Sequence, residues 1–320
     1  MSLLMVHLSE TAIHSITYLV KNIKKPKIIA IIGPTASGKS DLGIKIAQKF
    51  NGEVISADSR QVYRGMDIGT GKVSKQEQKL IRHHLIDVAN PRRRFSVDDF
   101  TSRAKRAIVE ISKRGKLPFV VGGTGFYVDA LIYDLNIPEV PPNKSLRAKL
   151  QKQSAEQLFV SLKKQDPARA KTIERHNKVR LIRALEIIDA IGKVPSFSTN
   201  YSQLPSKYDV LWLGLNPKNL ERRVATRVQK RFRRGMVAEV KKLIKNKVSL
   251  KRISEIGLTY RIVADFIQGT IDKKEMGQRV IRAEIQYAKR QMTWFKRNKK
   301  IAWVKDPGAA ERLVHRFLGR

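Results

Sequence analysis

The hydrophobic pattern of the chain begins with three short, largely apolar runs, each of which ends in small or polar residues. They are "KIIAIIG" (27–33), "GEVISAD" (52–58) and "LPFVVGGTG" (117–125). Runs of this length without alternation are typical of strands that are buried on both faces of a parallel sheet. Segments with helical periodicity follow the runs, and the one after Ser96 has an N-cap residue and an acidic first turn. The pattern predicts an α/β fold, a doubly wound parallel sheet flanked by helices.

This alternation stops at "NIPEVPPNK" (136–144), where three prolines interrupt the periodicity. The residues that follow, to about 191, have a helical and strongly basic pattern, and "DVLWLGL" (209–215) then has the pattern of a further sheet strand. We therefore expect an inserted all-helical domain. The predicted division begins with an N-terminal extension over 1–26, which forms either a short additional helix or an irregular end. It continues with the first part of the core over 27–138, the helical insertion over 139–204, and over 205–320 a return to the core plus basic C-terminal helices.

The charge balance indicates which class of molecule the protein binds. The 320 residues include 65 Lys and Arg against 28 Asp and Glu, a formal net charge of +37. Such an excess attracts polyanions, so a nucleic acid is the expected partner, with an anionic membrane surface as the alternative. No apolar run is long enough to cross a bilayer, and the chain has no cysteine, which excludes thiol catalysis and cysteine-ligated zinc. We expect a protein of the cytoplasm that does not enter a membrane.

The loop after the first apolar run matches the phosphate-binding pattern G-x-x-x-x-G-K-[ST] in full. Its members are Gly33, Pro34, Thr35, Ala36, Ser37, Gly38, Lys39 and Ser40. In such a loop the glycines let backbone N–H groups surround phosphate oxygens, the lysine adds a positive charge and the serine hydroxyl binds Mg²⁺. Loops of this pattern usually hold ATP or GTP. No second carboxylate clearly follows a run of apolar residues to hold a metal for hydrolysis, so the pattern predicts a phosphate ligand without identifying a nucleotide.

Two further polar residues end apolar runs, namely Asp58 and Thr124. Because the carboxyl ends of parallel strands meet at one edge of a sheet, Lys39, Asp58 and Thr124 are expected to share one cleft. Asp58 could orient Mg²⁺ or accept a proton from a nucleophile, and it could equally form the turn after its strand. Thr124 could offer its hydroxyl and nearby N–H groups to an anion, or its neighbouring glycines could serve close packing. The residues alone leave both choices open.

Seven stretches, in their order along the chain, resemble those of one family, the tRNA dimethylallyltransferases. They are "GPTASGKS", "DSRQVYRGMDIGTGK", "HHLID", "FSVDDF", "VGGTGFYVDAL", "RLIRALEI" and "AKRQMTWF", and they extend over about 27–297. The resemblance implies transfer of a dimethylallyl (isopentenyl) group from dimethylallyl diphosphate to N6 of the adenosine immediately 3′ of the anticodon in tRNA, with diphosphate released intact. It also implies a monomer and a bacterial-type enzyme.

The same resemblance implies roles for particular residues. The phosphate loop holds the diphosphate of the prenyl donor. Asp58 accepts a proton from the adenine amine as the new bond forms. The leaving diphosphate is stabilised by Lys39, Thr124, Mg²⁺ and an arginine, for which Arg223 is favoured over Arg227. Without the resemblance, Arg223 would be interpreted as a solvent-facing helix charge.

Contacts with the tRNA anticodon stem-loop are implied for three groups of residues. They are Asp58, Ser59, Arg60, Gln61 and Thr124 in the core, Arg147, Val179, Arg180, Leu181, Ile182 and Arg183 in the helical insertion, and Trp294 near the C-terminus. The insertion would hold the stem-loop against the core. Trp294 stands beside a basic run and could stack on a base. Alternatively, Trp294 could belong to the core while only the neighbouring charges face RNA.

Three other functions are open as alternatives. A small-molecule kinase or NTPase of the same architecture explains the phosphate loop, but neither the net charge nor the basic insertion. A non-catalytic RNA-binding protein predicts the loss of Lys39 or Asp58, and both are present. Prenyl transfer to free adenine nucleotides also explains the loop, but the basic insertion favours a substrate as large as tRNA.

Overall fold

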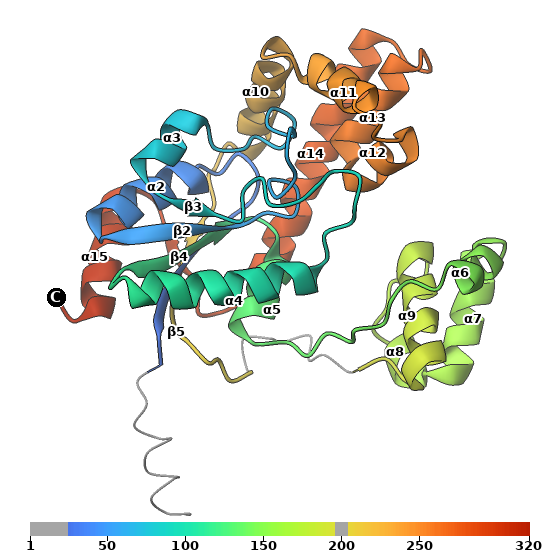
Figure 1. Cartoon of the computed structure of the whole chain (residues 1–320), viewed down its shortest axis with the longest axis horizontal. Coiled ribbons are helices and arrows are strands. Elements are labelled where there is room, and N and C mark those ends of the chain that lie inside the picture. Colours follow the sequence, from blue (N-terminus) through green and yellow to red (C-terminus); the bar gives the residue numbers. More distant parts are fainter. Residues whose placement is uncertain (1–24, 196–203) are drawn as a thin grey trace, which may run out of the picture. The chain divides into compact units, whose positions relative to one another are not determined.

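The computed structural model describes residues 25–195 and 204–320 (Figure 1). This described part divides into two compact units. One holds the residues up to Tyr133 together with Pro205–Arg320, and the other holds residues between Asp134 and Leu204. The predicted N-terminal helix lies outside the described residues.

The first unit is built on a parallel sheet, to which the described residues contribute six strands in the order β3-β2-β4-β1-β5-β6. The strands are β1 (Lys27–Ile32), β2 (Gly52–Ala57), β3 (His83–His84), β4 (Leu117–Gly122), β5 (Asp209–Leu215) and β6 (Ala302–Val304). Strand β1 lies between β4 and β5, with Lys27 beside Asp209 and Ile32 beside Gly214. The strand predicted over 209–215 therefore returns to the sheet, and the predicted α/β fold is confirmed.

Helices cover both faces of this sheet (Figure 1). Helices α2 (Lys39–Lys49) and α15 (Pro307–Leu318) pack on one face, where Ile29 and Ile31 of β1 join their apolar cluster. Helices α4 (Val97–Lys113) and α5 (Gly125–Ile132) pack together on the other face, and α3 (Lys75–Leu80) lies near α2. Helix α4 begins as predicted, because Ser96 and Asp99 form a capping box with each other's backbone N–H groups.

A buried carboxylate closes the amino end of β2. Glu53 is 1% exposed. It accepts hydrogen bonds from Arg114 (2.7 Å) and lies 2.7 Å from Nε2 of His84. Burial alone would raise the pKa of Glu53, but the hydrogen bonds from Arg114, His84 and Lys116 outweigh it and lower this pKa to about 2. This cluster stabilises the amino ends of the strands, at the end of the sheet opposite to the phosphate loop.

A layer of helices follows β5 in the first unit. It contains α10 (Leu220–Arg233), α11 (Met236–Lys245), α12 (Leu250–Ile256), α13 (Leu258–Ile267) and α14 (Lys273–Phe295). The buried residues of this layer form one cluster with Val62 and Met66, which come from the segment after β2. The segment between β2 and α3 is thereby fixed against helices that follow it by more than 150 positions in the sequence.

The second unit is a small helical bundle. It contains α6 (Lys144–Gln151), α7 (Ala155–Gln165), α8 (Pro167–Ala170) and α9 (Lys178–Ile191). Its core includes Leu158, Leu162, Leu181 and Leu185. The helical pattern predicted after the three prolines is therefore present, and this unit has an apolar core of its own.

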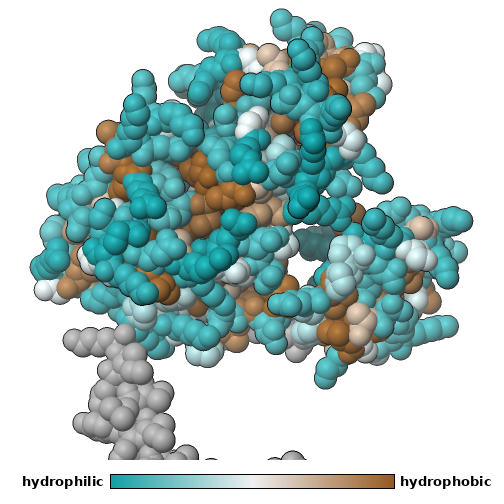
Figure 2. All heavy atoms as spheres, viewed as in Figure 1, coloured by the Kyte–Doolittle hydropathy of each residue, from teal (hydrophilic) through white to brown (hydrophobic). Residues whose placement is uncertain are grey.

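The surface of the chain agrees with its composition. On the face drawn in Figure 2, most visible residues are hydrophilic, with smaller hydrophobic patches between them. None of the helices within 25–195 and 204–320 is long and apolar enough to span a membrane.

Candidate active site

The site lies where β1, β2 and β4 end. The phosphate loop connects β1 to α2, Asp58 directly follows β2, and Thr124 is the N-cap residue of α5 after β4. Lys39, Ser40 and Asp58 line one cavity of about 90 Å³. Thr124 lies beside this cavity, where its Oγ1 accepts a hydrogen bond from the backbone N–H of Ser59 (3.0 Å). The geometry of the parallel sheet thus brings together residues that lie far apart in the sequence.

A side chain of α14 holds the backbone of the phosphate loop. Gln291 of α14 accepts a hydrogen bond from the N–H of Thr35 (2.8 Å) and donates one to the carbonyl of Gly123 (2.8 Å). It therefore ties the loop after β1 to the glycine turn after β4. Gly38 has a φ of 93°, a left-handed conformation that glycine adopts without strain. The hydroxyl of Ser37 is buried without a hydrogen-bond partner among the described residues, as expected for a loop that binds an anion.

Positive charges crowd around the cavity. Its lining includes Lys39, Arg227 and Arg231, and Arg231 is buried. Burial, reinforced by Arg227, lowers the pKa of Lys39 to about 8. Burial, reinforced by Arg231, lowers the pKa of Arg227 to about 10. Both pKa values are lowered because the nearby carboxylates do not fully offset burial and the repulsion between the cations. A multivalent anion in the cavity would therefore stabilise the charged forms of Lys39 and Arg227.

Glu284 of α14 supplies part of this compensation. Its Oε1 accepts hydrogen bonds from Nη1 of Arg231 (3.0 Å) and from the hydroxyl of Thr259 (2.8 Å). Glu284 and Asp58 are the carboxylates that line the cavity within the described residues. Because Glu284 is bonded to Arg231, it orients the cation cluster, whereas Asp58 faces the cavity from the sheet.

Asp58 forms the turn that follows β2, and it also lines the cavity. Its Oδ1 accepts hydrogen bonds from the backbone N–H groups of Arg60 (2.9 Å) and Gln61 (3.3 Å), so it forms the turn after β2. The same side chain also lines the cavity. The turn therefore fixes the carboxylate in place beside Lys39 and Ser40, which is the arrangement that a general base needs.

The arginine that was favoured from the sequence lies next to this cavity. Nε of Arg223 donates to the carbonyl of Ala36 (2.7 Å). Arg223 lines an adjoining groove of about 670 Å³, whose wall also contains Lys39 and Arg227. Arg227, the less favoured candidate, lines the cavity itself. Arg223 thus contacts the phosphate loop, while Arg227 and Arg231 face the interior.

The cavity also contains residues that the sequence did not single out. They include Arg231 of α10 and Glu284, Tyr287, Arg290 and Gln291 of α14. Arg231 follows Arg227 by four positions, so both lie on one face of α10. That spacing was visible in the sequence, but several other arginines in the same segment have no such role.

The residues expected to contact RNA are distributed over both units. Three of them follow Asp58 directly at the site, namely Ser59, Arg60 and Gln61. The guanidinium of Arg60 lies over the ring of Tyr287, 5.5 Å from its centre. In the helical unit, the guanidinium of Arg147 forms two hydrogen bonds of 2.6 Å with Glu186.

Helix α9 presents only some of its predicted contact residues to solvent. Val179 is 79% exposed and Arg180 is also exposed, whereas Arg183 is half-buried. Leu181 and Ile182 are buried in the core of the bundle. Since side chains three and four positions apart share one face of a helix, the run cannot present all five to RNA. The side chains of Leu181 and Ile182 therefore serve packing.

Trp294 packs against the beginning of α5. Its Nε1 donates to Oδ2 of Asp129 (2.7 Å), and its indole leaves no room for a Cβ on Gly125. Burial raises the pKa of Asp129 to about 7. The guanidinium of Arg297 lies over the indole of Trp294, 5.1 Å from the centre of the ring. These contacts favour the interpretation of Trp294 as a half-buried packing residue rather than a free stacking platform.

The lowered pKa of Lys39 leads to a pH prediction. An ammonium attracts phosphate only while it is protonated, so the affinity for inorganic diphosphate should fall as the pH rises above about 8. Isothermal titration calorimetry between pH 7 and 9.5 on the wild type and Lys39→Met measures this. Ionisation of the ligand is common to both proteins, so the ratio of their affinities isolates the lysine. A ratio that does not change with pH would contradict the prediction.

Fold and site together define the class of the protein. It is a parallel α/β protein with the phosphate-loop sequence, a cation-rich cavity at the strand ends and a separate helical unit.

Comparisons with known proteins give the family. A family model described as "IPP transferase" matches residues 61–298. A tRNA dimethylallyltransferase of Caldanaerobacter subterraneus subsp. tengcongensis is 38% identical over 286 residues, which cover 87% of this chain and 91% of that protein. The crystal structure of the full-length tRNA isopentenylpyrophosphate transferase from Bacillus halodurans matches with a TM-score of 0.66 and 36% identity, covering 92% of this chain and 96% of that one. A eukaryotic dimethylallyltransferase, described as acting on tRNA, matches with a TM-score of 0.75 and 29% identity over 92% of this chain and 80% of its own. The chain therefore belongs to the IPP transferase family of tRNA dimethylallyltransferases.

Proposed function

We propose that the chain transfers a dimethylallyl group from dimethylallyl diphosphate to N6 of the adenosine immediately 3′ of the anticodon in tRNA and releases diphosphate. The observation that carries this proposal is that Asp58 lines one cavity together with the cations Lys39, Arg227 and Arg231. The carboxylate suits a proton acceptor, and the cations suit a leaving polyanion. The family to which the chain belongs supplies the prenyl donor and the RNA acceptor.

The proposed reaction needs both the carboxylate and the cations of the cavity. The adenine amine attacks the allylic carbon, the carbon–oxygen bond of the donor breaks, and both electrons of that bond leave with diphosphate. The nitrogen loses one proton, which Asp58 accepts. Lys39 and the arginines stabilise the charge that grows on the leaving group, as preorganised cations do in other transfer reactions. Thr124 holds the turn that carries Asp58, since it accepts the hydrogen bond from Ser59.

Magnesium fits the residues that are present. No group of three or more His, Cys, Asp or Glu residues within the described ranges could hold a metal ion. Mg²⁺ commonly takes only one or two protein oxygens and completes its shell with water and substrate phosphates. Ser40 would supply a hydroxyl beside Lys39, and the bound ion would neutralise charge on the diphosphate.

The proposed acceptor of the prenyl group is an adenosine in the anticodon loop of tRNA. An adenosine in a single-stranded loop can leave its stack at low cost and enter a cavity. Arg60 and Tyr287 offer a cationic and an aromatic surface beside Asp58, and the exposed basic residues of the helical unit would contact the stem. We propose that the protein acts in this way as a monomer in the cytoplasm.

Mass spectrometry of nucleosides tests the proposed function directly. Unmodified tRNA is incubated with the protein, Mg²⁺ and dimethylallyl diphosphate, and the expected product is adenosine with one added isopentenyl group. Parallel reactions contain AMP in place of tRNA, or ATP without the prenyl donor. Modification of AMP alone would indicate transfer to free nucleotides, and consumption of ATP without prenyl transfer would indicate a kinase or NTPase.

Binding to tRNA should depend strongly on salt. The net charge of +37 indicates contacts with many phosphates, each of which releases a counterion. For six to ten such contacts we expect the affinity to fall by roughly 10³–10⁵-fold between 50 and 200 mM salt. Fluorescence anisotropy with a labelled anticodon stem-loop measures the slope. A flat response would contradict an RNA-binding surface built on charge.

A further inference from the structure

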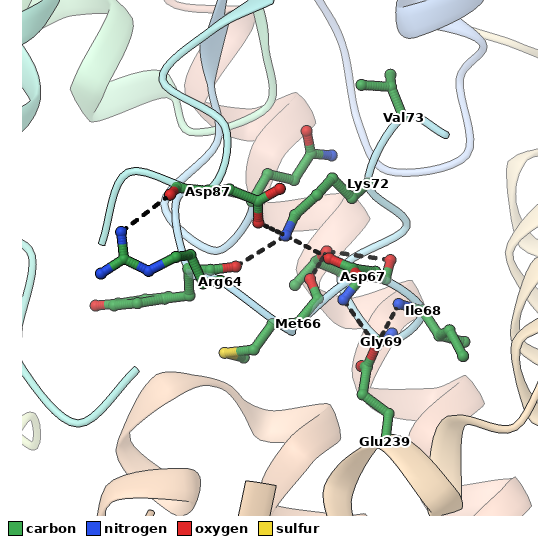
Figure 3. Close-up of polar contacts among 12 residues, drawn as sticks. Arg64, Met66, Asp67, Ile68, Gly69, Lys72, Val73, Asp87 and Glu239 are labelled. Atoms are coloured by element: carbon green, nitrogen blue, oxygen red, sulfur yellow. Dashed lines mark hydrogen bonds and ion pairs between the residues drawn. The ribbon is translucent and has the colours of Figure 1, made fainter. Parts of the chain in front are cut away.

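A carboxylate outside the cavity holds the loop that forms part of its wall. Glu239 lies in the first turn of α11, and its two oxygens accept hydrogen bonds from three consecutive backbone N–H groups (Figure 3). Oε2 accepts from Asp67 (2.7 Å) and Ile68 (2.7 Å), and Oε1 accepts from Gly69 (2.9 Å). Consecutive N–H groups that converge in this way form a site for an anion. Here the anion is a side chain of the protein.

The same carboxylate is fixed from a second direction. The hydroxyl of Tyr260 donates to Oε1 of Glu239 (2.8 Å), and its ring leaves no space for a Cβ on Gly69. Burial, together with the charge of Glu239, raises the pKa of Tyr260, so this hydroxyl keeps its proton and acts as a donor. Glu239, Tyr260 and the loop at 67–69 therefore form one rigid contact between the helical layer and the segment after β2.

The loop is also held from its other side. The ammonium of Lys72 donates to the carbonyl of Tyr63 (2.8 Å) and to the carboxylates of Asp67 and Asp87 (2.5 Å each), as Figure 3 shows. The side chain of Lys72 is buried. The loop is thus fixed by two charged side chains. The carboxylate of Glu239 accepts from its N–H groups, and the ammonium of Lys72 donates to the carboxylate of Asp67.

This loop carries the contacts that orient Arg227. Gly69 and Thr70 line the cavity beside Lys39. The carbonyl of Gly71 accepts hydrogen bonds from Nη2 of Arg227 (3.2 Å) and from Nε2 of Gln61 (3.4 Å). A Cβ on Gly71 would lie 2.2 Å from Nη2 of Arg227, so the loop backbone and the guanidinium are packed directly against each other.

We infer that Glu239 is a positioning residue for the transfer reaction: it fixes the loop at 67–71, and through the carbonyl of Gly71 it sets the orientation of Arg227 toward the diphosphate. Glu239 does not line the cavity that contains Lys39 and Asp58; it lines a separate groove together with Asp67 and Ile68. Its effect is therefore indirect. This inference rests on the proposed function, because it takes Arg227 to bind the diphosphate.

A double-mutant cycle tests the inference. Glu239→Gln keeps the length of the side chain, but it replaces one oxygen by an NH₂ group that faces N–H donors. We expect Glu239→Gln and Arg227→Ala each to lower the affinity for inorganic diphosphate by roughly tenfold or more, the factor that one charge-assisted hydrogen bond carries. The double variant should lose no more affinity than Arg227→Ala alone. Losses that multiply, or wild-type affinity in Glu239→Gln, would overturn the inference.

A matched control separates positioning from stability. Glu53→Gln alters another buried, multiply bonded carboxylate of the same unit, at the opposite edge of the sheet. It should lower the thermal midpoint without changing the affinity for diphosphate. If Glu239→Gln does not fold, Glu239→Asp takes its place in the same cycle, because it keeps the charge while its shorter chain cannot span the three N–H groups.

The cycle also distinguishes the two proposals. A wild-type protein that binds diphosphate and prenylates tRNA, with variants that show no coupling, would overturn only the role of Glu239. A wild-type protein that does neither would overturn the proposed function, and the role of Glu239 with it.

Discussion

Lys39→Ala is expected to lower the rate of prenyl transfer by about 10²–10³-fold, the loss that follows removal of one preorganised group that stabilises developing charge. The lysine begins α2, and its ammonium donates to the carbonyl of Pro34 (3.2 Å), which holds it at the phosphate loop. The loss should appear in single-turnover reactions with saturating tRNA, since the substitution does not remove an RNA contact.

The control for this prediction is Lys45→Ala. Lys45 lies on the same helix and is exposed, so it alters the net charge equally without touching the cavity. Equal losses in both variants would show that total charge, and not the position of Lys39, determines the rate. A Lys39→Ala variant with normal turnover would remove the phosphate loop from the reaction.

Asp58→Asn should have an effect of similar or greater size. A positioned base contributes about 10²–10⁴-fold to a rate, and asparagine cannot accept the proton. The amide oxygen can still accept the hydrogen bonds from Arg60 and Gln61, so the turn after β2 should persist. We therefore expect the rate of transfer to fall while the affinity for tRNA and the thermal midpoint stay close to those of the wild type.

The comparison for Asp58→Asn is Asp98→Asn. Asp98 is an exposed carboxylate in the first turn of α4, away from the cavity. It tests whether the loss of any one negative charge changes the rate. Unchanged turnover in Asp58→Asn would remove this carboxylate from the mechanism, and a matching loss of tRNA affinity would place it in RNA binding.

The parts of the site that the sequence predicted are those fixed by local chemistry. The phosphate loop is a contiguous pattern of small residues between a strand and a helix, and Asp58 follows an apolar run directly. Such features carry their structural context with them. The sheet was predictable for the same reason, because β1, β2, β4 and β5 are largely apolar runs. The three-residue strand β6 is too short to give a comparable signal.

The other half of the site depends on packing between distant helices. Helix α10 contains arginines at positions 222, 223, 227, 231 and 233, and all have the same local chemistry. Only the contact of α10 with α14 determines that Arg227 and Arg231 face inward, whereas Arg223 contacts the phosphate loop. Likewise, Glu239 meets the loop at 67–69 across about 170 positions of sequence. No periodicity in a single segment could indicate such a contact.

The two hydrogen bonds of Gln291 have a consequence for biosynthesis. The bond to Thr35 joins residues 256 positions apart, and β1 cannot pair with β5 until residues 209–215 exist. Contacts of such long range form late, since a large loop must close before they can be made. During translation, the phosphate loop is complete near the amino terminus long before the residue that holds it has left the ribosome. The nascent chain therefore carries its substrate-binding sequence in an incomplete form, and competence for transfer arises only after the residues of α14 have been synthesised.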